Sequence, residues 1–333
     1  MDKTSEGFRF RTEIGKSASC LDLTYSSTFF AIGSCFAENT GTILQERKFI
    51  ASVNPFGTIY DPLSIHRLIK YAVENNTPDP SGFVERDGLF FCDEIHSSVH
   101  AGSREALNIK INELVAEVHR QIIITDVFLV TYGTAFIYSR MDSGKSVANC
   151  HKLPGGLFEK KLLSVEEIIT SFLEVHSLIR KINPASRFIL TVSPVRHLKD
   201  TLELNVVSKA VLRLAVHKLK ELPGVFYFPA FEIMNDDLRD YRFYAADMIH
   251  PSDQAIDYIW SHLRLCLFEP ETLDLMARVE KLNRSLNHRP FNPESSSHKK
   301  FLKSLEQEIL ELNPIIDLSR ELSEVKALLK NSE

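Results

Sequence analysis

The sequence lacks the features that would assign it to several special classes of protein. In 333 residues, no apolar run approaches the roughly 18 residues of a membrane span. Basic residues form no stripe, and 39 Lys and Arg are outnumbered by 44 Asp and Glu, for a net charge of -5. We therefore expect neither a nucleic-acid partner nor a membrane span. The first residues, Met1 to Glu6, are polar and lack the apolar core of a signal peptide.

Cysteine is too sparse and irregular for a disulfide scaffold. The chain has five scattered cysteines: Cys20, Cys35, Cys92, Cys150 and Cys266. An odd, scattered set is typical of free thiols in a reducing compartment, so we expect a cytoplasmic protein. The hydrophobic content of 44% and charged content of 25% are ordinary for a globular chain.

Short apolar runs without polar alternation predict buried strands of a parallel sheet. Four such runs are present: Phe29 to Ile32, Val127 to Thr131, Phe188 to Val192 and Val225 to Phe228. Segments with helical spacing follow them: Ser164 to Ile182, Ser208 to Leu222 and Asp253 to Leu267. The first of these helices has a capping box, Ser164 with Glu167. The alternation predicts an α/β fold with helices on both sides of the sheet.

Further segments depart from this alternation. Residues 75–103 and 141–156 are rich in turn residues, and the second segment is typical of a hairpin or long loop. From about Glu269 the composition changes, and Lys299 to Lys330 is a charge-dense amphipathic helical stretch with Pro314 in its middle. We predict an α/β domain over residues 1–268 and a helical appendage over 269–333. Its helices are the candidate contact of a homo-oligomer.

Two possible nucleophiles stand where the first predicted strand ends. Gly33, Ser34 and Cys35 follow the apolar run, and Phe36 to Arg47 has the pattern of a helix. A helix N-terminus lowers a thiol pKa and can hold an oxyanion, and Gly33 permits a tight turn. The alternative is a plain turn with Cys35 as a small buried apolar residue.

A second motif, Asp247-Met248-Ile249-His250-Pro251, lies just before a predicted helix. A histidine that takes a proton from a nucleophile needs a carboxylate to hold its tautomer, and Asp247 is placed to do this for His250. Pro251 suits the first turn of the next helix. The alternative is a helix-capping segment with a hydrogen-bonded histidine.

The segment Gly33-Ser34-Cys35-Phe36-Ala37 reads letter for letter as the signature of the GSCFA family, which is similar to the SGNH (GDSL-like) hydrolases. The resemblance extends over about residues 20 to 265. Its further landmarks are Asn54-Pro55-Phe56-Gly57, Thr131-Tyr132-Gly133-Thr134, Asn149-Cys150-His151, Thr191 to Val195, Tyr227 to Glu232, Asp237 to Tyr244 and Asp247 to Pro251.

The resemblance implies a three-layer α/β/α sandwich with a flavodoxin-like parallel sheet and an activity on esters or thioesters without a cofactor. Gly33, Ser34 and Cys35 align with the Gly-Asp-Ser block of the SGNH hydrolases, which makes Cys35 the nucleophile; a shift by one residue makes it Ser34. The terminal Asp-x-x-His maps onto Asp247 and His250.

The resemblance also implies two oxyanion donors. Gly57 matches the loop glycine that donates its backbone N–H. The asparagine that supplies the second donor is missing from Gly133-Thr134-Ala135-Phe136, and Thr134 or Asn149 is the candidate replacement. Loss of one such donor typically costs about 100- to 1000-fold in rate.

Several polar residues are candidate substrate contacts. Arg239 and Arg242, with Tyr244, precede the Asp–His segment, and their alternative role is an ion pair with Asp236, Asp237 or Asp240. Arg196, beside His197, follows a predicted strand, where α/β folds bind ligands.

Two groups of cysteine and histidine are candidates for a further site. Cys92, His96 and His100 have the spacing of zinc ligands only on a helix, and their surroundings look extended, so we expect no metal. Cys150-His151 is a second Cys–His pair or a structural contact.

The sequence therefore predicts a hydrolase of acyl esters or thioesters, with a small-molecule, glycan or lipid ester as substrate. An acyltransferase would use the same residues. Two functions of a different kind stay open: a ligand-binding module that lost turnover, and a thiol-regulated protein built on Cys35.

Overall fold

The computed structural model describes residues 11–15, 21–288, 290–292 and 294–331, so Cys20 and the N-terminal decapeptide lie outside the described residues. The described chain forms two compact units. The first contains residues 11–15, 28–42 and 51–263, and the second contains 21–27, 43–50 and 264–331. The predicted division into 1–268 and 269–333 stays a prediction.

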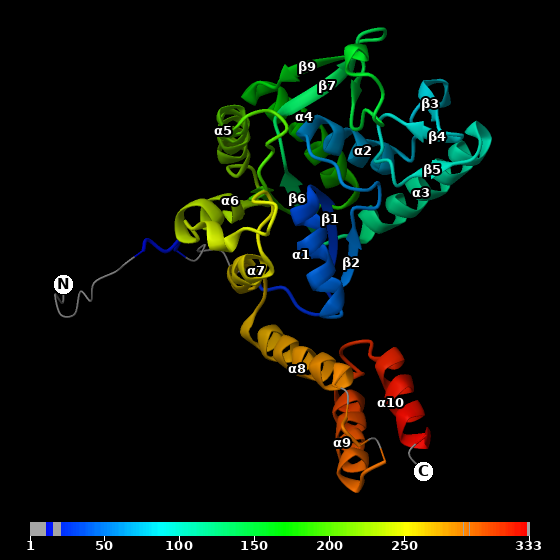
Figure 1. Ribbon diagram of the computed structural model, residues 1–333, viewed down its shortest axis with the longest axis vertical. Coiled ribbons are helices and arrows are strands. Elements are labelled where there is room, and N and C mark those ends of the chain that lie inside the picture. The colour runs from blue at the N-terminus through cyan, green and yellow to red at the C-terminus, as the bar shows by residue number, and fades with distance from the viewer. Residues whose placement is uncertain (1–10, 16–20, 289, 293, 332–333) are drawn as a thin grey trace, which may run out of the picture. The chain divides into compact units, whose positions relative to one another are not determined.

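A five-stranded parallel sheet forms the centre of the first unit (Figure 1). Its strands are β1 (Thr28–Gly33), β2 (Ile50–Val53), β6 (Val127–Tyr132), β10 (Arg187–Val192) and β11 (Val225–Tyr227). Their spatial order is β11-β10-β6-β1-β2, which is the 2-1-3-4-5 order of flavodoxin-like folds. All four predicted strands are confirmed. The fifth, β2, is only four residues long and none of them is fully buried, so it left no apolar run in the sequence.

Helices cover both faces of this sheet. Phe30, Phe128 and Phe188, from three adjacent strands, share one buried cluster with apolar side chains of four helices. These helices are α2 (Pro62–Glu74), α3 (Arg104–Ile124), α4 (Val165–Ile182) and α5 (Leu202–Leu219). On the other face, Gly41 of α1 (Cys35–Glu46) packs directly on Ala31 and Val53. The predicted α/β/α layering is thus confirmed.

The ends of three helices can be compared with those that the sequence predicts. The capping box of α4 is present, with Ser164 and Glu167 bonded reciprocally, and α7 (Asp253–Leu267) has its predicted bounds. The prediction that α5 starts at Ser208 is wrong. α5 begins six residues earlier because Thr201 caps it, accepting a hydrogen bond from the Leu204 N–H at 3.2 Å.

The two turn-rich segments contribute to two small antiparallel sheets. The first sheet consists of β3 (Phe83–Arg86), β4 (Leu89–Cys92) and β5 (His100–Ala101). The second consists of β7 (Phe136–Arg140), β8 (Ser146–Val147) and β9 (Phe158–Leu162). Short helical turns complete the unit: η1 (Pro80–Gly82), η2 (Gly155–Leu157), α6 (Ala230–Glu232), η3 (Ile233–Asp237) and η4 (Tyr241–Phe243).

The second unit is helical. It contains α8 (Pro270–Asn287), α9 (Ser296–Leu312) and α10 (Ser319–Asn331), so the stretch around Pro314 forms two helices separated by a break. Tyr25 and Phe268 stack on opposite sides of Phe49, with ring centroids 4.3 and 4.7 Å apart. None of the helices that the structure describes is long and apolar enough to cross a bilayer.

A buried histidine lies in the core of the first unit. His66 of α2 has hydrogen-bond contacts on both ring nitrogens, Nε2 with the Tyr132 hydroxyl at 2.7 Å and Nδ1 with Ser171 Oγ at 2.9 Å. Burial lowers the pKa of His66 to about 3. An unfolded histidine binds its proton near pH 6.5, so the unfolded chain takes up more protons than the folded chain between these values.

We therefore expect the free energy of unfolding to fall as the pH drops from 6.5 towards 3, with His66 contributing a slope of about 1.4 kcal/mol per pH unit. His66→Gln should remove this contribution, whereas His262→Gln, at an intermediate-exposure site of α7, should retain it. Urea denaturation at a series of pH values measures both slopes. Equal slopes in His66→Gln and the unmodified protein would contradict the assignment.

Candidate active site

The turn between β1 and α1 is formed by close contact of two backbones. The Ser34 N–H donates to Thr131 O of β6 at 3.1 Å, and Gly33 has a φ of 137°. A Cβ atom on Gly33 would lie 2.1 Å from Thr131 O, so no other residue fits here without a backbone shift. The turn therefore places Ser34 and Cys35 at the carboxyl edge of the sheet.

The two candidate nucleophiles have different surroundings. Ser34 is fully buried, and its Oγ accepts a hydrogen bond from the Phe36 N–H at 3.3 Å. Cys35 is the first residue of α1 and is partly exposed. Burial raises the pKa of the Cys35 thiol, and its own backbone N–H and the charge of Lys209 oppose that rise. Of the two groups, Cys35 is thus the one open to a substrate.

Asp247 and His250 form a hydrogen-bonded pair on the loop before α7. The His250 Nδ1 and Asp247 Oδ2 are 2.7 Å apart, and Asp247 Oδ1 accepts the backbone N–H groups of Ile249 and His250 at 2.9 and 3.0 Å. These contacts, led by the His250 side chain, lower the pKa of Asp247 to about 2. With Nδ1 held by the carboxylate, Nε2 is the ring nitrogen that can accept a proton.

The His250 loop is attached to the same edge of the sheet as Cys35. The Arg196 N–H, just beyond β10, donates to Ile249 O at 3.2 Å. β10 and β1 both neighbour β6, so the two halves of the site start from strands two spacings apart, about 10 Å. Among the described residues no hydrogen bond joins Cys35 to His250.

Between these halves lies a group of residues that the sequence analysis did not assign to the catalytic set. Lys209 of α5 is buried, and its Nζ donates to Gly133 O at 2.8 Å and Ser193 O at 2.7 Å. The His197 ring meets the Tyr60 ring edge-on with centroids 5.1 Å apart. Burial, followed by the charge of Lys209, lowers the pKa of His197 to about 4.

A signal for Lys209 is present in the sequence. The buried face of α5 consists of residues at helical spacing: Asn205, Ser208, Lys209, Leu212, Ala215, Val216 and Leu219. Lys209 is the only charged side chain among these, and a lysine inside a buried stripe is unusual unless it has a partner. The helix predicted from Ser208 to Leu222 contains Lys209 and five of the other six residues of this face, so the signal was available in the sequence.

The three predicted oxyanion donors differ in their present contacts. The Gly57 N–H donates to Asn54 O at 2.7 Å, so it is already in use as a donor. Thr134 Oγ1 accepts from the Phe136 N–H and contacts Ser208 Oγ, each at 3.1 Å. Asn149 Oδ1 accepts from the His151 N–H at 2.8 Å, a bond that occupies the amide oxygen and not the amide N–H groups that would donate. Their assignment as oxyanion donors stays a prediction, and for Gly57 it requires the present hydrogen bond to change.

The predicted substrate residues divide into two kinds. The Arg196 guanidinium lies over the Tyr244 ring, 3.9 Å from its centroid, and contacts Met248 O, so it braces the His250 loop. Arg239 pairs with Asp236 at 2.7 Å and Arg242 with Asp240 at 3.7 Å, and both arginines are largely exposed. These ion pairs agree with the alternative role considered for them, and substrate contact stays a prediction.

The remaining cysteines and histidines of interest have structural contacts. His151 is buried, stacks on Phe91 with centroids 4.9 Å apart, and its Nε2 contacts Cys92 O at 2.9 Å. His96 packs against the Cα of Gly57. Across the part of the chain that the structure describes, no three His, Cys, Asp or Glu side chains gather as metal ligands.

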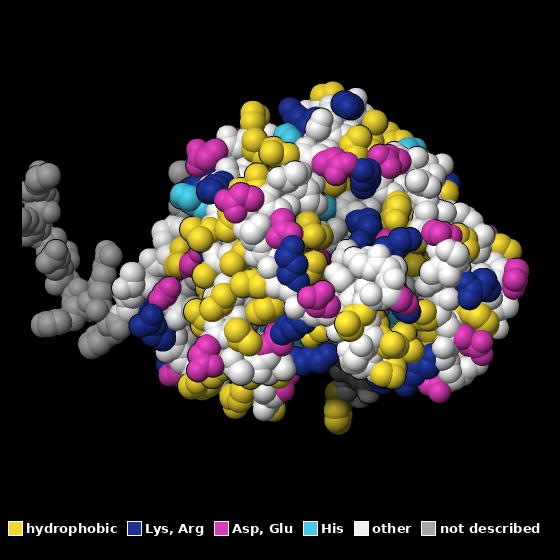
Figure 2. Space-filling model, turned by 90° about the horizontal axis from the view of Figure 1, so that it is seen from above, with side chains coloured by type: hydrophobic (Ala, Val, Ile, Leu, Met, Phe, Trp, Pro, Cys, Tyr) yellow, Lys and Arg dark blue, Asp and Glu magenta, His cyan; other side chains and the backbone are white. Residues whose placement is uncertain are grey.

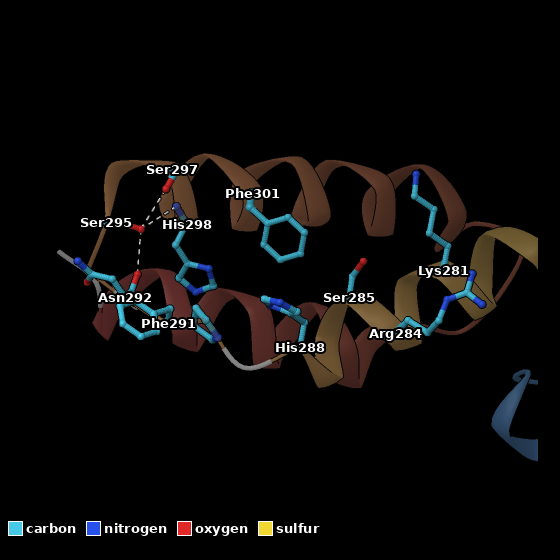
Figure 3. Close-up of a pocket in the computed structure, with 11 residues that line it drawn as sticks. Lys281, Arg284, Ser285, His288, Phe291, Asn292, Ser295, Ser297, His298 and Phe301 are labelled. Carbon is cyan, nitrogen blue, oxygen red and sulfur yellow. Dashed lines mark hydrogen bonds between the residues drawn. The ribbon is translucent and has the colours of Figure 1, made fainter.

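Two cavities are lined by residues other than Cys35 and His250. One, of about 640 Å³, is in the second unit, where His288, just after α8, lies opposite Phe301 of α9 (Figure 3). The second, of about 360 Å³, is lined by Arg140, Asp142 and residues of β3 and β4. Acidic and basic side chains are interspersed on the face of the molecule in Figure 2.

The first unit is thus an α/β/α sandwich with flavodoxin-like strand order and a Cys, His and Asp set at the carboxyl edge of its sheet. The chain belongs to the GSCFA family: the model of that family matches residues 28–263. A second model, the C-terminal domain of GSCFA domain proteins, matches residues 279–331. The resemblance read from the sequence is confirmed.

Two solved structures resemble this chain at low sequence identity. A Streptococcus pneumonia protein, named provisionally as a platelet activating factor, is 14% identical with a TM-score of 0.38, covering 72% of this chain and 82% of its own. An acetyl xylan esterase from the rumen bacterium Butyrivibrio proteoclasticus is 14% identical with a TM-score of 0.35, covering 80% of this chain and 65% of its own. A comparison with curated proteins gives no match.

The close approach of Gly33 to Thr131 can be tested by substitution. Gly33→Ala should lower the free energy of unfolding by ~2–4 kcal/mol, because the added Cβ collides with Thr131 O at a positive φ. Gly102→Ala is the matched control, since nothing lies within 4 Å of its Cβ position. Urea denaturation compares the two variants, and equal stability would refute the close approach at Gly33.

Proposed function

We propose that this protein is a hydrolase of acyl esters or thioesters with Cys35 as nucleophile, His250 as base and Asp247 as the residue that orients His250. The observation that carries the proposal is the 2.7 Å contact between Asp247 Oδ2 and His250 Nδ1, on a loop tied to the same sheet edge as Cys35. Similarity of the GSCFA family to SGNH hydrolases supports the same assignment of roles.

The proposed reaction depends on where the proton of the Cys35 thiol lies at each step. Because burial raises the Cys35 pKa, the resting group is a thiol, and its proton passes to His250 Nε2 as sulfur attacks the acyl carbon. The leaving alcohol or thiol takes this proton from His250 when the tetrahedral intermediate collapses. Water then attacks the acyl–sulfur bond with its proton passing to His250, which releases the acid and restores the thiol.

The N-terminus of α1 supports the charged intermediate. The Cys35 N–H belongs to the first turn, where backbone N–H groups lack partners within the helix and attract negative charge. The Cys35 N–H lowers the pKa of the thiol, so it favours negative charge at this position. We propose it as the first oxyanion donor, with the Thr134 hydroxyl or the Asn149 side-chain amide as a second donor, and with Gly57 joining only if a bound substrate displaces its hydrogen bond to Asn54 O.

The absence of the asparagine donor and the present engagement of the Gly57 N–H favour a second candidate function. A ligand-binding module of this fold would keep the pocket and lack turnover, since one missing oxyanion donor already costs about 100- to 1000-fold in rate. An acyltransferase would use the same three residues with a hydroxyl group in place of water. Product analysis with and without an added alcohol distinguishes transfer from hydrolysis.

Covalent labelling tests the identity of the nucleophile. We expect iodoacetamide to alkylate Cys35 in preference to Cys92, and a fluorophosphonate to leave Ser34 unmodified, because Ser34 and Cys92 are buried. Mass spectrometry of the peptides measures both, with His250→Ala beside each. Fluorophosphonate labelling of Ser34 that depends on His250 would overturn the choice of Cys35, and ligand binding without labelling at either residue would favour the binding module.

The Asp247→Asn substitution tests the pair more sharply than removal of either residue. An asparagine Oδ1 can still accept the two backbone N–H groups, so the loop keeps its turn, whereas its amide N–H₂ donates to Nδ1 and leaves the proton on Nε2. We expect hydrolysis of a p-nitrophenyl acyl ester or an acyl thioester to fall roughly 10³- to 10⁴-fold. Asp236→Asn, at an exposed ion pair, should keep its rate. Comparable rates in the two variants would exclude the proposed role of Asp247.

A further inference from the structure

Lys209 is a buried cation that has no carboxylate partner among the described residues. It is 2% exposed, and none of the described Asp or Glu side chains forms an ion pair with it. Burial of an uncompensated charge is costly, so a lysine is retained at such a place only where its charge or its hydrogen bonds are needed.

The Lys209 ammonium group bridges the ends of two strands. Its Nζ donates to Gly133 O, which follows β6, and to Ser193 O, which follows β10. The two segments are also joined directly, because the Ser193 N–H donates to Tyr132 O at 2.9 Å. The third N–H of the ammonium group is not used by either carbonyl, and the Phe231 ring centroid lies 6.0 Å from Nζ.

The same edge carries Cys35. The Ser34 N–H is bonded to Thr131 O, only two residues before the carbonyl that Lys209 holds. Burial lowers the pKa of Lys209 to about 7, and negative charge on Cys35 raises it. In return, the Lys209 charge lowers the pKa of the Cys35 thiol.

Further titratable groups surround this pair. His197 faces Lys209 from the segment after β10, and its pKa of about 4 keeps it neutral near pH 7. Glu38 of α1 opposes ionisation of Cys35, and the Tyr60 pKa is raised by burial, Cys35 and Glu38. Of these groups, Lys209 is therefore the one whose positive charge favours the Cys35 thiolate.

We propose that Lys209 is the positioning residue for the nucleophile: its ammonium group, fixed by Gly133 O and Ser193 O, supplies the positive charge that stabilises the Cys35 thiolate. This inference rests on the proposed role of Cys35. As the thiol proton passes to His250 Nε2, Lys209 keeps its own protons and acts only by charge, and the burial of Lys209 makes this attraction stronger than it would be in water. Cys35 and Lys209 thus titrate as a coupled pair.

The pH dependence of Cys35 alkylation tests whether the Lys209 charge stabilises the Cys35 thiolate. In Lys209→Met, we expect the midpoint of the iodoacetamide rate at Cys35 to rise by one pH unit or more, which lowers the rate at pH 7 about tenfold. Lys209→Arg, which keeps the charge and has N–H groups for both carbonyls, should restore most of the rate. Lys218→Met, at an exposed site on the same helix, is the matched control and should keep the midpoint.

The outcomes separate this inference from the proposed function. An unchanged midpoint in a cooperatively folded Lys209→Met variant would overturn the role of Lys209, even if His250→Ala alters the rate. A raised midpoint in Lys209→Met with no effect of His250→Ala would support Lys209 and refute the role of His250.

A measurement on the natural chain avoids any failure of Lys209→Met to fold. Cys35 is alkylated with iodoacetate or with iodoacetamide, which add groups of similar size that differ by one negative charge. Carbon-13 NMR of the lysine Cε atoms then reports their titration. We expect one lysine to titrate near pH 7, with a midpoint at least one unit higher after iodoacetate. A lysine midpoint that is the same after both reagents would overturn the proposal.

Discussion

The contact between the ends of β1 and β6 is the constraint on which the candidate site depends. Gly33 lies so close to Thr131 that a side chain does not fit at this turn, and α1 starts directly after it, at Cys35. The loop after β2 docks on the same residue: Asn54 Oδ1 accepts the Gly33 N–H at 2.9 Å, and the Ile59 N–H donates to Gly33 O at 3.0 Å. One backbone contact thus fixes the candidate nucleophile and the neighbouring loop together.

The site combines a buried half with an exposed half. Cys35, Lys209 and His197 lie in surroundings that penalise charge, and their pKa values shift accordingly. Asp247 and His250 are about half exposed and depend on their mutual hydrogen bond. A partly buried thiol and a buried ammonium group act more strongly on each other than two exposed groups do, because less water screens them. The roles that we propose for the two halves follow from this difference.

The sequence predicted the elements whose signals are local. The runs that became β1, β6, β10 and β11, the capping box at Ser164 and the Asp247–His250 pair each depend on residues close together in the chain. Lys209 was missed because its two carbonyl partners follow strands that are distant from it in the sequence. The candidate oxyanion donors were placed by resemblance alone, and their present partners depend on loop packing.

The amino-acid sequence was enough to specify the α/β class, the family and the residue types of the site. Apolar runs and short motifs are set by neighbouring residues, and the hydrogen bond between Asp247 and His250 spans only three positions. Tertiary packing was needed to show that Ser34 is buried and Cys35 open, and that the charge beside Cys35 comes from Lys209 of α5. This is because strand order brings Cys35, Gly133 and Ser193 to one edge, and burial there raises the effect of every charge.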